Sequence, residues 1–125
     1  MANRIKVLVV DDKKVIGDFF DFTLGYFGHD ITVVHDPREA VKVVQQQDFD
    51  IAFLDIMMPE KNGVEVLREM KNVVPQLPVV MMSGYSLQEM KDEAMQLGAA
   101  WCLKKPFELD DVRQVMNVTL GKNIE

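Results

Sequence analysis

Short, uninterrupted apolar runs recur along the chain and are separated by segments with helical periodicity. A run of strand length without polar alternation is typical of a strand that is covered on both faces, as in a parallel sheet. The clearest run ends at Asp55, before Pro59, which cannot continue a strand ladder. Five strands are predicted, at residues 5–10, at 31–34, within 49–59, at 78–83 and at 100–104.

Between and after these runs, apolar residues recur three or four positions apart, which predicts five amphipathic helices. Gly28 and Gly98 are placed as C-terminal stops, Asn62 as an N-cap, and Asp36–Glu39 and Ser86–Glu89 as capping boxes. The predicted buried stripes are Ile16, Phe19, Phe20, Thr23, Leu24 and Phe27; Ala40, Val41 and Val44; Val64, Leu67, Met70 and Val74; Leu87, Met90, Ala94 and Leu97; and Leu109, Val112, Val115 and Met116.

Strands that alternate with helices through short connections predict one doubly wound α/β domain over residues 1–125. Crossovers between parallel strands are right-handed, so the carboxyl ends of all the strands meet at one edge of the sheet. The polar residues at those ends should therefore become neighbours. They are Asp11, Asp12, Asp55, Ser83 and Lys105.

The composition excludes some classes of partner but does not indicate a function. The chain has 125 residues and a formal net charge of −6, which argues against nucleic acid as a direct partner. Cys102 is the only cysteine, so no internal disulfide can form, and we expect a cytoplasmic protein. The first apolar run is too short for a signal peptide or a membrane span, and we expect no membrane partner.

The predicted edge carries the parts needed for phosphoryl chemistry. Three neighbouring carboxylates repel one another and require a cation, and all-oxygen ligands suit Mg²⁺, with Met57 offering its backbone carbonyl. The Ser83 hydroxyl and the Lys105 ammonium group would stabilise a transferring phosphoryl group. Asp55 is then the nucleophile, and its product is an acyl phosphate.

Over almost its whole length the chain resembles a response-regulator receiver domain of the stand-alone, chemotaxis-protein-like kind. The pieces that carry the resemblance are Asp11-Asp12, Asp55 to Pro59 with Gly63, Ser83, and Lys105-Pro106-Phe107, in that order. The resemblance implies a flavodoxin-like (βα)5 fold with strand order 2-1-3-4-5. It also implies that the Lys105-Pro106 bond is cis.

The resemblance assigns roles to the same residues. Asp12 would bind Mg²⁺ directly and Asp11 mainly through water, while Asp55 accepts a phosphoryl group from a histidine kinase or phosphotransfer protein. Ser83 and Lys105 would contact the phosphoryl oxygens. Such a domain is a signalling switch that catalyses its own phosphoryl transfer and later hydrolyses its acyl phosphate. Its downstream protein target would bind the fourth helix, fifth strand and fifth helix.

One position departs from the family pattern. Three residues before Lys105, where many receivers carry a Tyr or Phe, this chain has Cys102. Trp101 precedes it, but consecutive strand residues point to opposite faces, so Trp101 cannot replace the missing ring. We expect phosphorylation to repack the output surface by another route, through Tyr85.

Other interpretations remain open at this point. The same fold can serve as an interaction module without phosphorylation, although the intact acidic residues disfavour that. A flavin-binding protein would want a phosphate-binding loop after the first strand, and an aspartyl phosphatase an Asp-x-Asp arrangement there. His29 and His35 lack metal-ligand spacing, and we expect both at the surface. Cys102 is expected to have no redox role.

Overall fold

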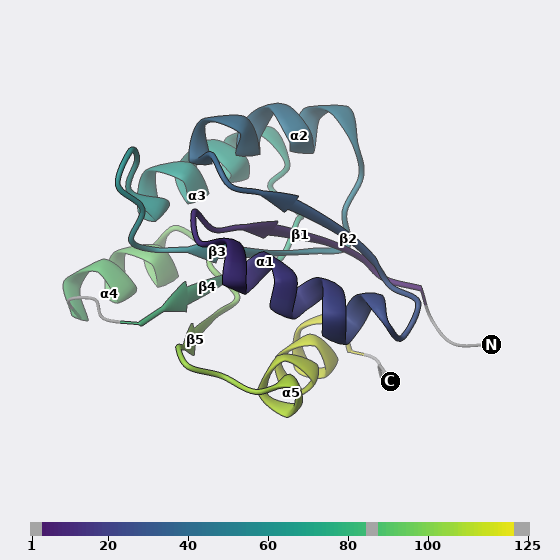
Figure 1. Cartoon of the computed structure of the whole chain (residues 1–125). Helices are drawn as coiled ribbons and strands as arrows, with labels where there is room; N and C mark the ends of the chain where they lie inside the picture. Colours follow the sequence, from purple (N-terminus) through teal and green to yellow (C-terminus); the bar gives the residue numbers. More distant parts are fainter. Residues whose placement is uncertain (1–3, 85–87, 122–125) are drawn as a thin grey trace.

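The computed structural model describes residues 4–84 and 88–121, and its five strands form one sheet in the order β2-β1-β3-β4-β5 (Figure 1). All neighbouring strands run parallel. The predicted α/β class and strand order are therefore confirmed. The strands are β1 (Lys6–Val10), β2 (Asp30–Val34), β3 (Ile51–Asp55), β4 (Val79–Ser83) and β5 (Trp101–Lys104).

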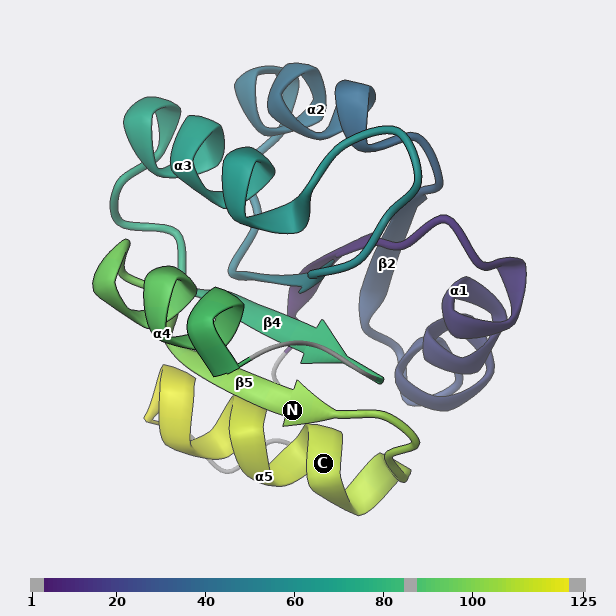
Figure 2. The ribbon, with the colours of Figure 1, turned by 90° about the vertical axis from the view of Figure 1, so that its left-hand side faces the viewer.

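Helices cover both faces of the sheet, with α1 and α5 on one face and α2, α3 and α4 on the other (Figures 1 and 2). None of the helices within residues 4–84 and 88–121 is long and apolar enough to cross a membrane. The helical segments are α1 (Lys14–Phe20) with its π-helical continuation η1 (Asp21–Gly25), the 3-10 turn η2 (Pro37–Glu39), α2 (Ala40–Gln46), α3 (Gly63–Val73), α4 (Gln88–Gln96) and α5 (Leu109–Leu120).

β3 lies at the centre of the sheet, and all of its residues are buried. Its alternate side chains supply two cores: Ile51 and Phe53 pack on the α1 and α5 side, and Ala52 and Leu54 on the other. Burial on both faces explains why this stretch of sequence is apolar without alternation. Asp55 is consequently a carboxylate at the exit of a strand that is buried on both faces.

Several predicted helix ends are confirmed. The Asn62 side chain accepts a hydrogen bond from the backbone N–H of Val64 (2.8 Å), and Asp36 accepts one from Arg38 (2.9 Å). At Asp36 only the N-cap half of the predicted capping box is confirmed, because the Glu39 carboxylate lies 3.3 Å from the Lys42 ammonium group. Gly28 and Gly98 adopt φ angles of 92° and 100°, which a residue with a Cβ rarely adopts. The predicted cap at Ser86, together with Leu87, falls outside the described residues.

The first helix differs from the prediction in its last turns. After Phe20 the helix widens into the π-helical segment η1, where the Thr23 hydroxyl donates to the carbonyl of Phe19 (2.6 Å). A π turn holds an extra residue and rotates the side chains that follow it. Phe27, predicted to lie on the buried stripe, is therefore 42% exposed, and the Arg113 guanidinium lies 4.5 Å from its ring centroid.

The prediction that His29 lies at the surface is wrong. His29 is only 6% exposed, and its Nδ1 accepts a hydrogen bond from the backbone N–H of Ile5 (3.0 Å). The ring thus satisfies a buried donor at the start of the first strand, a role that depends on the pairing of β1 with β2. His35, by contrast, is exposed as predicted.

Candidate functional site

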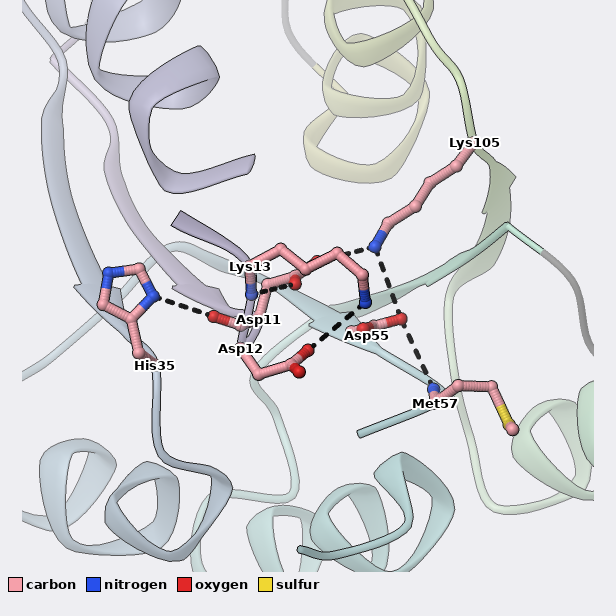
Figure 3. A network of polar contacts seen from close by, with 7 residues as sticks. All are labelled: Asp11, Asp12, Lys13, His35, Asp55, Met57 and Lys105. Carbon is pink, nitrogen blue, oxygen red and sulfur yellow. Dashed lines mark hydrogen bonds and ion pairs between the residues drawn. The ribbon is translucent and has the colours of Figure 1, made fainter. Parts of the chain in front are cut away.

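The predicted acids and Lys105 lie together at the carboxyl edge of the sheet, although they come from three strands (Figure 3). Asp11 and Asp12 follow β1, Asp55 ends β3, Ser83 ends β4, and Lys105 follows β5. Asp11, Asp55 and Ser83 are buried. Parallel strand order brings these positions together, because every strand delivers its last residue to the same edge.

The three carboxylates form a compact cluster, and the Lys105 ammonium group lies close to two of them. One oxygen from each of Asp11, Asp12 and Asp55 lies within 4.8 Å of the other two. Lys105 Nζ lies 2.7 Å from Asp11 Oδ2 and 3.5 Å from Asp55 Oδ1. Its side chain is only 14% exposed, so its charge is poorly screened by water and compensates both acids.

Asp55 is held by one oxygen and is unpartnered at the other. Its Oδ1 accepts a hydrogen bond from the backbone N–H of Met57 (3.3 Å), whereas its buried Oδ2 has no hydrogen-bond partner among the described residues. Burial, and then the charge of Asp11, raises the pKa of the Asp55 carboxyl, while Lys105 acts in the opposite direction. The carboxylate form therefore carries a free-energy cost that a further cation would relieve.

Hydrogen bonds from Lys13 and His35 orient Asp11. Its carboxylate accepts the backbone N–H of Lys13 (2.9 Å), and its carbonyl accepts the Nδ1–H of the His35 ring (3.0 Å). Its own N–H donates to the carbonyl of Val34 (3.1 Å). We predicted neither contact from the sequence. The His35 contact joins the ends of β1 and β2, which lie side by side only in the folded sheet, whereas the Lys13 contact is local, two residues from Asp11.

Lys13 also reaches the cluster with its side chain. Its Nζ lies 3.5 Å from Asp12 Oδ1, and the chain arches across the carboxylates (Figure 3). We did not predict this contact from the sequence. The available signal was a lysine directly after the acid pair.

Gly63 holds the loop that follows Asp55 against the end of β3. Its N–H donates to the carbonyl of Ile56 (2.8 Å). A Cβ at this position would collide with the backbone carbonyl oxygen of Asp55 and lie 2.7 Å from the Cα of Ile56. The close approach of two backbones therefore requires glycine here, and it sets the direction in which Asp55 leaves the sheet.

The donor set fits Mg²⁺. It consists of carboxylate oxygens without a neighbouring thiolate, and a hard cation prefers oxygen ligands. Two buried oxygens, Oδ2 of Asp55 and Oδ1 of Asp12, make no hydrogen bond within the described part of the chain, and a cation would satisfy them. Met57, predicted to add its backbone carbonyl, contacts Asp55 through its backbone N–H, and the residue is 50% exposed.

Ser83 and Lys105 are linked through their backbones at neighbouring strand ends. The N–H of Lys105 donates to the carbonyl of Ser83 (2.8 Å), which keeps the two residues in register. The Lys105-Pro106 bond is cis, as expected. Ser83 and Lys105 are thus neighbours at the ends of β4 and β5.

On β5, Trp101 and Cys102 face opposite ways, as alternation predicts. Cys102 packs toward α4, where its Sγ lies 4.0 Å from the sulfur of Met95. Trp101 lines a groove with α5 on the other face and is 54% exposed. Burial raises the pKa of the Cys102 thiol, which disfavours the reactive thiolate.

Comparison with known proteins gives a consistent result. The response regulator receiver domain family matches residues 7–117. The chain is similar to the Vibrio cholerae chemotaxis protein CheY4, at 28% identity over 94% of this chain and 100% of the other, with a TM-score of 0.87. It is also similar to the receiver domain of NtrX from Brucella abortus, at 32% identity over 92% of this chain and 98% of the other, with a TM-score of 0.83.

Proposed function

This chain belongs to the response regulator receiver domain family, and from that premise we propose that it is a phosphoacceptor switch of two-component signalling. The observation that carries the proposal is the convergence of Asp55 with two further acids and the Lys105 ammonium group at one sheet edge. Phosphoryl transfer needs a nucleophile, an acid pair that binds a cation, and a positive charge near the phosphoryl oxygens.

In the proposed reaction, a carboxylate oxygen of Asp55 attacks the phosphorus of a phosphohistidine on the donor protein. A P–O bond forms, the P–N bond breaks, and the donor imidazole takes up a proton as it leaves. Lys105, whose Nζ lies 3.5 Å from Asp55, would contact the charged phosphoryl oxygens, and Ser83 would donate its hydroxyl to another of them. The domain itself thus supplies the electrostatic part of the catalysis.

Members of this family generally bind Mg²⁺ at an acidic pocket, and Asp11, Asp12, Asp55 and the carbonyl of Met57 would hold it here. When bound, the ion neutralises negative charge on the carboxylates and the phosphoryl group. Lys13 and His35 orient Asp11 through hydrogen bonds that need no cation, so this acid is organised in advance.

The acyl phosphate would later be hydrolysed by the domain itself, as expected for a switch rather than a metabolic enzyme. We propose that this hydrolysis is slow, because Met57, a bulky residue two positions after Asp55, would screen the acyl phosphate from water. Tyr85, two residues after Ser83, would shield the acyl phosphate in the same way, but it lies outside the described residues.

The proposed output surface comprises α4, β5 and α5. It offers exposed apolar side chains from each element, namely Met95, Trp101 and Val118. Cys102 occupies the position where many family members carry an aromatic ring, and its contact with Met95 gives the strand a direct connection to α4. The route that we proposed from the sequence, through Tyr85, falls outside the described residues.

Receiver domains in general interact with kinases or phosphotransfer proteins and with downstream targets. We propose the same two classes of partner for this chain, and no direct nucleic-acid partner, since its net charge is −6. The single cysteine supports a reducing, cytoplasmic setting.

The decisive experiment is to incubate the protein with Mg²⁺ and acetyl phosphate and measure its intact mass. We expect one base-labile phosphoryl group on the wild type and none on Asp55→Asn, which keeps the size of the side chain but removes the nucleophile. An adduct on neither protein would favour an interaction module that works without phosphorylation. An adduct on both would place the modification on another residue.

A further inference from the structure

Two ammonium groups divide the three carboxylates of the site between them. Lys105 pairs with Asp11 and Asp55, whereas Lys13 pairs with Asp12. Among the described residues, Lys13 provides the only ion pair of Asp12, whose Oδ1 is buried and makes no hydrogen bond. The two lysines leave one carboxylate charge uncompensated, which makes the resting cluster mildly anionic.

The two lysines differ in how firmly they are placed. The Lys105 side chain is largely buried, and its Nζ lies 2.7 Å from its partner oxygen. The Lys13 side chain is 58% exposed, and its Nζ lies at the longer distance of 3.5 Å. Lys13 is also the N-cap residue of α1 and makes no side-chain capping bond, so only its ion pair keeps the ammonium group over the acids.

The backbone of Lys13 makes a contact that is separate from the ion pair of its side chain. Its N–H donates to Asp11 Oδ1 (2.9 Å), which anchors the first atoms of the residue beside the acid pair. From this anchor the side chain arches across the cluster toward Asp12 (Figure 3). A substitution that keeps the backbone N–H therefore removes the ammonium group without removing the support of Asp11.

We propose that Lys13 is a built-in counter-cation of the metal-free state, which competes with a divalent cation for Asp12 and lowers the affinity of the site for that cation. The inference rests on the proposed function for the identity of the cation as Mg²⁺. A divalent ion at the cluster would bring the positive charge into excess and repel the Lys13 ammonium group. Because this side chain is half in solvent, it can move away at little cost, whereas Lys105 stays.

The test is calorimetric titration of Mg²⁺ into the unphosphorylated protein. Lys13→Gln should bind Mg²⁺ about three- to tenfold more tightly than the wild type, the size expected when one half-exposed unit charge is removed. Lys13→Arg keeps the charge and should remain close to the wild type. Lys14→Gln is the matched control, because Lys14 pairs with Asp18 (2.9 Å) and not with the cluster. The affinity of this variant for Mg²⁺ should stay close to that of the wild type.

Thermal unfolding gives a second readout. Without Mg²⁺, Lys13→Gln should unfold at a lower temperature than the wild type, because Asp12 has lost its partner. Saturating Mg²⁺ should raise the unfolding temperature more in Lys13→Gln than in the wild type or Lys14→Gln.

Equal Mg²⁺ affinity of Lys13→Gln and the wild type would overturn the proposal, as would an equal gain in Lys14→Gln, which would point to net charge alone. Treatment of the wild type with acetyl phosphate separates this outcome from failure of the proposed function. Absence of a phosphoryl adduct refutes the phosphoacceptor role and leaves the competition between Lys13 and Mg²⁺ to be decided by the titration.

Discussion

The two helices that follow the site-bearing strands β3 and β4 are attached to the domain to very different degrees. α3 buries five residues against the sheet and begins with a side-chain cap from Asn62. In α4, Ala94 is the only residue buried among those that the structure describes. Both helices lie on the same face of the sheet and lead away from the same cluster (Figure 2).

This difference separates the part of the site that must stay in place from the part that is proposed to respond. Asp55 and its following loop are held by the close backbone contact at Gly63 and by the packing of α3. α4 buries little apolar surface, so it requires little free energy to repack, as regions with few buried contacts generally do. A local charge change at Asp55 would therefore be transmitted more easily to α4 than to α3.

The largest effect is expected at the most rigid point on the α3 side. Gly63→Ala should destabilise the fold by about 3 kcal/mol or more, because the new Cβ would collide with the carbonyl oxygen of Asp55 and force the backbone apart. Urea unfolding measures this. Gly25→Ala is the control, since its Cβ would meet other atoms only at ordinary distances of 3.8 and 3.9 Å. Equal stabilities would show that the loop after Asp55 is not rigid.

Truncation of one buried side chain in α3 should have the next largest effect. Leu67→Ala is expected to lower the free energy of unfolding by about 2–5 kcal/mol, as for other fully buried leucines. Met95→Ala in α4 removes a half-exposed side chain and should change it by about 0.5 kcal/mol or less. Comparable losses in chemical denaturation would contradict the unequal attachment of the two helices.

The helix cap at Asn62 should contribute less than the packing. Asn62→Ala removes the acceptor of the Val64 N–H and should cost about 1 kcal/mol. Asn72→Ala, at an exposed position of the same helix, serves as the control and should be neutral or slightly stabilising. The comparison is made from thermal unfolding curves, and a similar loss in both variants would indicate that the cap contributes nothing.

Asp55→Asn should have a smaller effect of the opposite sign. Because the pKa of Asp55 is raised in the folded protein, its ionisation destabilises the fold, so the amide should stabilise the metal-free protein near neutral pH. As the pH falls through the raised pKa toward the ordinary value of 3.8, wild-type Asp55 becomes protonated and the gain should fade. Unfolding measured from neutral pH to about 4 checks this, and a gain that grows in acid would exclude it.

Much of the fold followed from local sequence pattern. The five apolar runs and the end signals at Asn62, Gly28 and Gly98 predicted elements that the structure contains. The strand order came from the resemblance to a family and not from the pattern itself. Phe27 was misplaced because a π turn in the preceding segment is invisible in a regular 3.6-residue period.

The sequence alone determined which chemical groups stand at strand ends, because the apolar runs that precede Asp11, Asp55 and Ser83 could only be buried strands. It did not determine which residues orient those groups. His29 was judged polar and exposed, yet it accepts the N–H of Ile5, and Lys13 and His35 hold Asp11 through contacts that no periodicity encodes. The Lys13 contact is local, two positions from Asp11, and depends on the conformation of the turn after β1. Only the folded sheet decided the pairings of His29 and His35, since each joins residues 24 positions apart that the fold brings side by side.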